Sequence, residues 1–171
     1  CQQLQQRVAL VQVHADQIVE RARLAGNARP VLRLWPRPSL LQRPDDPELA
    51  HVGMTEVQAR DEYGDIRVLR HPFAENDRAL AERQADGLAK IITTKKGTIV
   101  GASIVGPHAE ELIQSWILPT QKKMKIGAIA GLIIPYPTLG EVNKRAAGSY
   151  YTPKIFSERM RTIVRFLLKF A

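Results

Sequence analysis

Apolar residues near the start of the chain recur in steps of three and four, the spacing of one face of an α-helix. The series consists of Leu4, Val8, Val11, Ala15, Ile18 and Ala22. Gly26 and Asn27 follow and favour the end of the helix. We therefore predict a helix here, which either packs on the rest of the chain or pairs with another helix.

The next stretch, residues 27–47, is rich in proline. Its five prolines are Pro30, Pro36, Pro38, Pro44 and Pro47. Proline removes a backbone donor and fixes the backbone, so this stretch is extended chain or loop. We predict an N-terminal helix and Pro/Arg-rich linker over 1–45, a compact domain over 46–150 and a C-terminal segment over 151–171.

From residue 46 the pattern is that of mixed strands and helices. Residues 49–53 form a short apolar run that predicts a strand. Thr55 is a candidate N-cap for a helix that Gly64 would end. Apolar positions over 66–69 predict a further strand that stops near Pro72.

The strongest local signal is a hairpin. Two β-rich runs, 88–94 and 98–106, flank Lys95-Lys96-Gly97. Pro107 in the first turn and two acidic residues behind it predict a helix to Ser115 or beyond, which Pro119 would break or kink.

Two short helices and a basic tail complete the pattern. Residues 126–132 predict an apolar helix, and Thr138 with Glu141 three positions later predicts a capping box on the next one. Residues 157–170 predict a basic amphipathic helix, which would dock on the domain or a partner, or lie on an anionic membrane through residues 154–170.

Composition narrows the class of protein. The chain has 171 residues, 44% of them hydrophobic, a net charge of +8 and a single cysteine. An internal disulfide and a cysteine-rich zinc site are therefore excluded. No apolar run reaches the roughly 20 residues of a membrane span, and no signal peptide is visible, so we expect a cytoplasmic protein that is either free or membrane-associated.

The common catalytic, nucleotide-binding and metal-binding motifs are absent from the sequence. It has no dinucleotide-binding or phosphate-binding glycine motif, and no histidine pair at metal-ligand spacing, so we predict no metal. Cys1 is a lone terminal thiol and a poor candidate nucleophile. These absences suggest a domain that supports chemistry carried out elsewhere.

Several ordered motifs resemble the C-terminal dimerisation domain of the flavin-dependent pyridine nucleotide-disulfide oxidoreductases, which include dihydrolipoamide dehydrogenase and mercuric reductase. The resemblance covers roughly residues 46–150. It rests on the segments 46–56, 76–79, 87–92, 99–113 and 136–141.

The resemblance implies an α+β fold in which helices flank an antiparallel sheet. It also implies a homodimer, in which a His-Pro-Thr-x-x-Glu loop reaches the partner subunit's flavin and redox disulfide. The histidine of that loop acts as the acid–base group and the glutamate orients it, which suits an imidazole that titrates near neutral pH. The parent enzyme would use FAD and NAD(P) and serve cell redox homeostasis.

Here the loop reads Tyr136-Pro137-Thr138-Leu139-Gly140-Glu141, so a tyrosine replaces the histidine. A phenol with a pKa near 10 is a poor proton shuttle at neutral pH, although it can donate a hydrogen bond to a thiolate or ligand. By the resemblance, Tyr136 and Glu141 are the candidate catalytic residues, and Pro137 and Thr138 lie near the partner's flavin. The alternatives are a packed loop tyrosine and a helix-capping glutamate.

The parent's flavin and nicotinamide regions do not fit into residues 1–45, and no cysteine pair is present. We therefore expect a C-terminal fragment, a split gene product, or a product of a shifted reading frame upstream of about Asp46. Such a chain carries no cofactor, is inactive alone, and binds a second copy or the missing flavin-binding part.

The alternative is a basic module for an anionic membrane or nucleic acid. The low aromatic content of 6% argues against nucleic acid, since single-strand binders stack bases on aromatic rings. A free-standing enzyme built on Tyr136 and Glu141 ranks last.

Overall fold

The computed structural model describes residues 39–43, 47–155, 158, 165–166 and 168. The predicted N-terminal helix and most of the predicted C-terminal amphipathic helix lie outside these residues. In chain order the elements are β1 (Ser39–Arg43), β2 (Leu49–Gly53), α2 (Glu56–Tyr63), β3 (Ile66–Pro72), η1 (Phe73–Glu75), α3 (Asp77–Ala81), β4 (Leu88–Thr94), β5 (Ile99–Val105), α4 (Ala109–Gln121), α5 (Gly127–Ala130), α6 (Glu141–Gly148) and α7 (Thr152–Ile155).

The five described strands form one sheet in the order β1-β2-β5-β4-β3, and every neighbouring pair is antiparallel. The predicted hairpin supplies the centre, where Ile91 of β4 lies opposite Ala102 of β5. Strand β2 pairs with β5, although about fifty residues separate them along the chain. The fold is therefore the expected α+β class, an antiparallel sheet flanked by helices.

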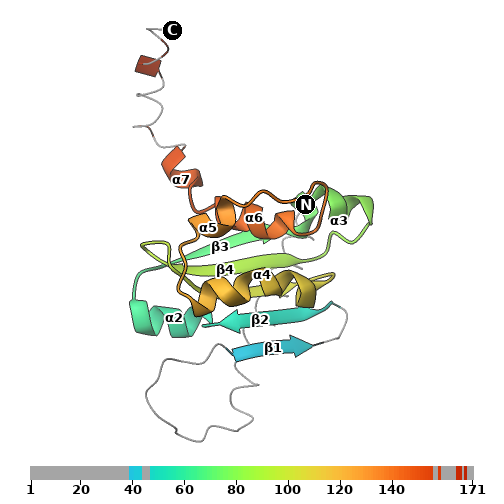
Figure 1. Ribbon diagram of the computed structural model, residues 1–171, viewed down its shortest axis with the longest axis horizontal. Helices are drawn as coiled ribbons and strands as arrows, with labels where there is room; N and C mark the ends of the chain where they lie inside the picture. Colours follow the sequence, from blue (N-terminus) through green and yellow to red (C-terminus); the bar gives the residue numbers. More distant parts are fainter. Residues whose placement is uncertain (1–38, 44–46, 156–157, 159–164, 167, 169–171) are drawn as a thin grey trace, which may run out of the picture.

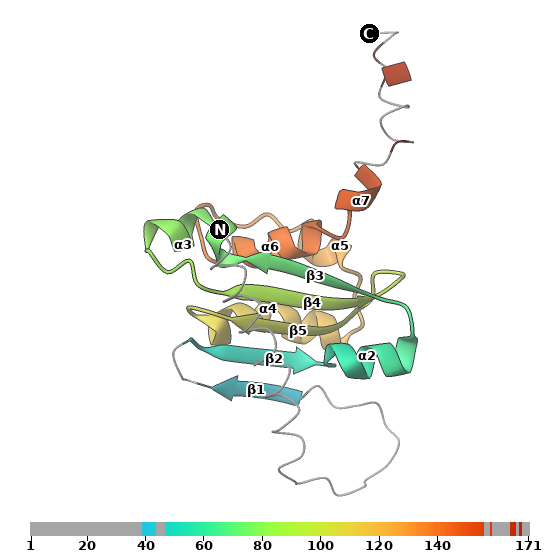
Figure 2. The same ribbon diagram turned by 180° about the vertical axis from the view of Figure 1, so that it is seen from behind.

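The two faces of the sheet are covered by different helices (Figures 1 and 2). Helices α4, α5 and α6 cover one face, and α2 crosses one end of the other. Successive residues of β4 point to opposite sides: Ile91 belongs to the core cluster that contains Trp116 of α4, and Ile92 packs in the cluster that contains Ala59 of α2. The period-two pattern of the strands thus builds a core on both faces.

Helix α2 begins and ends where its sequence predicts. The Thr55 side chain accepts from the Gln58 backbone N–H at 3.3 Å, and the Gln58 side chain accepts from the Thr55 N–H at 3.0 Å. This capping box satisfies two N–H groups that the helix leaves unpaired. Gly64 ends the helix with a positive φ of 67°, a conformation that suits glycine.

Helices α4 and α5 and strand β1 are among the elements that differ from the sequence-based expectation. Pro119 does not break α4, which continues to Gln121; a proline this close to the helix end removes only one late hydrogen bond. The short helix α5 stops at Ala130 and leaves Leu132 outside it. Strand β1 lies in the stretch expected to be linker, where its backbone extends the sheet by pairing with β2.

Among the described residues, no helix combines the length and the apolar character that a bilayer crossing requires.

Candidate functional site

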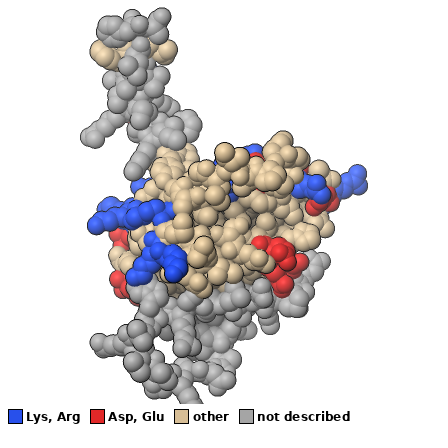
Figure 3. Space-filling view, in the orientation of Figure 1, with Lys and Arg blue, Asp and Glu red and all other residues tan. Residues whose placement is uncertain are grey.

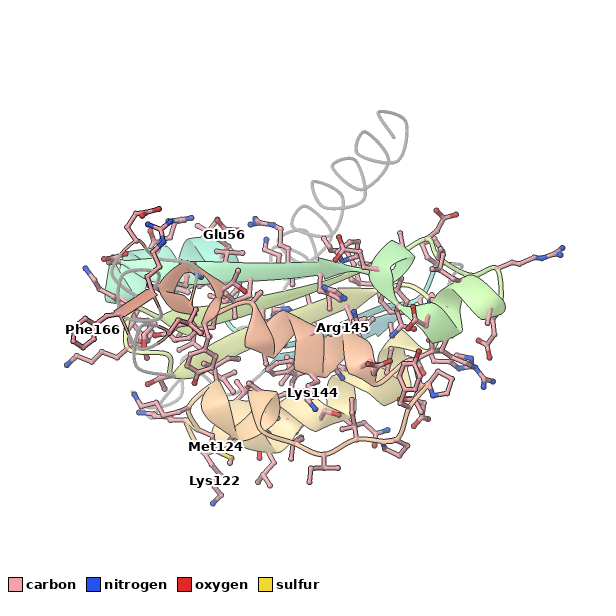
Figure 4. All side chains as sticks on the ribbon, turned by 90° about the horizontal axis from the view of Figure 1, so that it is seen from above. Glu56, Lys122, Met124, Lys144, Arg145 and Phe166 are labelled. Atoms are coloured by element: carbon pink, nitrogen blue, oxygen red, sulfur yellow. The ribbon has the colours of Figure 1, made fainter. Side chains whose placement is uncertain are left out.

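The candidate site is built on the connection between α5 and α6. Its central part, residues 132–137 (Leu-Ile-Ile-Pro-Tyr-Pro), is here called the apolar loop. Ile133 is 99% exposed and Tyr136 is 67% exposed, so the loop's largest side chains face solvent. The connection runs beside α3, at the end of the sheet away from α2 (Figures 1 and 4).

The hydroxyl of Tyr136 is held within the chain. Its Oη donates a hydrogen bond of 2.7 Å to Oδ2 of Asp77, the first residue of α3. This hydrogen bond raises the pKa of Tyr136 above its ordinary value, and the negative charge of Asp77 adds to the effect. Tyr136 is therefore a neutral phenol at physiological pH, and its proton points at Asp77 rather than outward.

A second hydrogen bond, from Asn76 to Thr138, holds the chain just after the apolar loop. Asn76 is fully buried, and its Nδ2 donates to the backbone oxygen of Thr138 at 3.1 Å. Its Oδ1 accepts from the Ala79 N–H at 2.9 Å and so caps α3. Asn76 and Asp77 thus hold residues 136–138 at two points from one neighbouring helix start.

Thr138 does not form the predicted capping box. Its Oγ1 donates to the backbone oxygen of Pro135 at 2.9 Å, which stabilises the turn of the loop. Gly140 is the N-cap of α6 and makes no side-chain cap hydrogen bond. The hydroxyl turns back into the loop because Pro135 offers it an acceptor three residues earlier.

Glu141 and Tyr136 are not hydrogen-bonded to one another. Oε1 of Glu141 lies 3.5 Å from Nη2 of Arg145, one helical turn later, while Oε2 is buried and makes no hydrogen bond within the described residues. In Figure 4, Arg145 lies on the side of α6 nearer β3. The acidic partner of the aromatic residue at 136 is therefore Asp77, which comes from a different element.

His71 of β3 lies under this region and was not among the predicted site residues. It is 8% exposed, its Nδ1 lies 3.6 Å from Oε2 of Glu75, and its buried Nε2 makes no hydrogen bond in the described part of the chain. Burial lowers the pKa of His71; Glu75 and Glu141 oppose this effect and Arg145 adds to it. His71 is thus kept neutral beneath the site.

This burial predicts a pH-dependent stability. As pH falls below about 6.5, the unfolded chain protonates its histidine before the folded chain does, so the free energy of unfolding decreases. Each unit by which the pKa is lowered is worth about 1.4 kcal/mol. Urea denaturation between pH 5 and pH 8 is expected to show a smaller pH dependence in His71→Gln than in the unsubstituted chain.

The matched control is His108→Asn. His108 is exposed and has a positive φ of 55°, a conformation that asparagine also tolerates. This control retains the buried His71 and is therefore expected to retain the pH dependence assigned to it. An equal reduction in both variants would contradict the assignment to His71.

Sequence reasoning found the loop but missed the residues that hold it. The sequence indicates Asn76 and Asp77 only as part of a family-like segment, although an asparagine just before a short helix is a typical N-cap signal. Their contact with the loop spans about sixty residues, so it could not be read from local pattern. Among the described residues, no group of three or more His, Cys, Asp or Glu side chains is arranged to hold a metal ion.

The fold, an antiparallel sheet with helices, and the Tyr-Pro-Thr-x-x-Glu motif of residues 136–141 both agree with the family that the sequence resembles. The sequence profile of the pyridine nucleotide-disulphide oxidoreductase dimerisation domain matches residues 45–147. The chain belongs to this family.

Relatives of known activity match the chain over a similar length. A dihydrolipoyl dehydrogenase of Bacillus subtilis is 44% identical over 103 residues, which cover 60% of this chain and 22% of that protein. A dihydrolipoyl dehydrogenase of Rhizobium etli is 36% identical over 107 residues, which cover 62% and 22%. The chain therefore spans only about a fifth of the length of these relatives.

Solved structures give the same fold. LpdA of Mycobacterium tuberculosis superimposes with a TM-score of 0.61 at 25% identity, covering 77% of this chain and 28% of that chain. RclA of Escherichia coli, an HOCl-induced flavoprotein disulfide reductase, gives 0.62 at 25% identity, covering 66% and 26%.

Proposed function

We propose that this chain forms the homodimer interface of an FAD- and NAD(P)-dependent disulfide oxidoreductase and that its apolar loop carries Tyr136 into the partner subunit's active site. The flavin, the nicotinamide site and the redox cysteines would belong to the rest of the enzyme. Alone, the chain would bind no cofactor and have no activity.

The observation that carries this proposal is the exposure of the apolar loop. Leu132 is 44% exposed and Ile133 is 99% exposed. Pro135, Tyr136 and Pro137, which follow in the chain, are exposed as well. A run of apolar side chains in water is unfavourable and marks a surface that another molecule covers. In a twofold dimer the same surface of each subunit would cover the apolar loop of the other.

The surrounding surface favours an apolar partner. On the face that carries α4 to α6, a broad uncharged area lies between basic side chains at one end and acidic ones further along (Figure 3). Helix α4 adds Leu118, which is 58% exposed, to this face. Few charges would have to be desolvated when a second copy docks here.

Light scattering with simultaneous visible absorption tests the proposal. We expect a colourless dimer whose mass is the same at low and high salt, because an apolar contact is not screened by ions. A monomer at all concentrations would contradict the homodimer. A yellow protein would show that a flavin binds to this chain and would contradict its role as an interface alone.

The membrane alternative depends mainly on residues 154–170, and most of these lie outside the described part of the chain.

A further inference from the structure

The feature that the proposed function leaves unexplained is the hydrogen bond between Tyr136 and Asp77. Tyr136 lies on the apolar loop and Asp77 begins α3, and their oxygens are 2.7 Å apart. This distance is typical of a hydroxyl bound to an ionised carboxylate, which is among the stronger hydrogen bonds in proteins. The adjacent Asn76 donates to Thr138, which directly follows the apolar loop, so the pairing is supported by a second contact from a buried side chain.

We propose that Asp77 is a positioning residue. It accepts the only hydrogen bond that the Tyr136 hydroxyl can donate, so that the phenol oxygen is left to accept a hydrogen bond from the partner subunit. Its ligand would be a protonated donor group, such as the S–H of a thiol. This inference rests on the proposed function, because it assumes that the apolar loop enters the partner's active site.

The chemistry of the phenol supports this assignment. A tyrosine hydroxyl has one proton to donate and an oxygen that can also accept. With the proton directed to Asp77, the remaining capacity of the oxygen is to accept. This differs from the sequence-based expectation that Tyr136 donates to a thiolate, because that expectation did not include Asp77.

The charge on Asp77 also disfavours ionisation of the Tyr136 phenol. Ionisation of the phenol would place two negative charges 2.7 Å apart, which the local geometry disfavours. Unlike an imidazole, this side chain therefore neither takes up nor releases a proton near neutral pH. It would orient a protonated group rather than act as an acid or base.

The first test is a tyrosine titration by NMR on the full 171-residue chain, labelled at the tyrosine ring carbon that bears the hydroxyl. The Tyr136→Phe variant assigns the resonance. In Asp77→Asn, which keeps the shape and an acceptor oxygen but removes the charge, we expect the Tyr136 midpoint to fall toward the ordinary value of about 10. An unchanged midpoint would overturn the pairing.

Two controls make this titration specific. Tyr63, whose pKa burial and Glu62 raise to about 12, should not move in Asp77→Asn. Asp65→Asn removes another exposed carboxylate, which pairs with Lys95, and should leave Tyr136 unchanged. An equal shift of Tyr136 in Asp65→Asn would assign the effect to overall charge and overturn the specific role of Asp77.

The second test uses the full-length flavoenzyme and compares kcat/KM for Asp77→Asn, Tyr136→Phe and the double variant. If Asp77 acts through Tyr136, the double variant should be no slower than Tyr136→Phe, within about twofold. If the fold-losses in kcat/KM of the two single variants multiply in the double variant, the proposal is overturned.

The NMR titration needs no dimer and no cofactor. A shifted midpoint in a monomeric chain would therefore support the Tyr136–Asp77 pairing while contradicting the interface proposal, so the two failures can be distinguished.

Discussion

Replacing Leu132 and Ile133 together by aspartate is expected to weaken association of the chain by at least about 100-fold. Each buried apolar side chain of this size contributes about 1.5–3 kcal/mol, and about 1.4 kcal/mol corresponds to a tenfold change in the dissociation constant. The two carboxylates would also lose water in the interface. Light scattering across a dilution series measures the shift from dimer to monomer.

The fold itself should tolerate this double substitution, because Ile133 is 99% exposed and Leu132 is 44% exposed in the single chain. The matched control is Val57→Asp on α2, where the side chain is 63% exposed and lies away from the apolar loop. Val57→Asp should leave the mass unchanged. If the double variant remains a dimer at all concentrations, the apolar loop is not the contact.

Trp116→Ala is expected to lower the free energy of unfolding by about 3–5 kcal/mol, the range for removal of a large buried aromatic side chain. Trp116 of α4 is fully buried, and its Nε1 donates to Oδ1 of Asn143 on α6 at 2.9 Å. Asn143 in turn donates to the backbone oxygen of Leu112 at 2.8 Å. The substitution therefore leaves a cavity and removes the donor of the buried Asn143 side-chain oxygen. Urea denaturation followed by circular dichroism measures the loss.

Two further variants separate these effects. Trp116→Phe keeps most of the ring but removes the donor, and it should cost about 1–3 kcal/mol for the unsatisfied Asn143 oxygen. Ser115→Ala alters the exposed neighbouring residue on the same helix and should change stability by less than about 0.5 kcal/mol. A loss for Trp116→Ala as small as that for Ser115→Ala would contradict the described packing.

The local elements were largely predictable because their signals are local. The hairpin over 88–106 is confirmed, since β-rich runs on both sides of Gly97 leave few other arrangements. The Thr55 cap and the Gly64 stop are confirmed for the same reason. Pro119 was misjudged because the rule against helical proline applies to the middle of a helix, and here the residue lies in the last turn.

The site was only partly predictable. The motif located Tyr136 and Glu141 but implied that the carboxylate five residues later would serve the aromatic residue. In the structure Glu141 faces Arg145, and Asp77 serves Tyr136. A motif in which the glutamate orients a histidine does not predict which group accepts the hydrogen bond of a tyrosine hydroxyl at the same position.

The sequence by itself determined strands β2 to β5, both ends of α2 and the mixed α+β pattern of the domain. These follow from periodicity, capping and turn chemistry, which act over a few residues. Only the tertiary structure decided that β2 lies beside β5, that His71 is buried and that Asn76 and Asp77 hold the loop. Those contacts join residues up to about sixty positions apart, and they form because the sheet brings the start of α3 and the start of α6 to the same end.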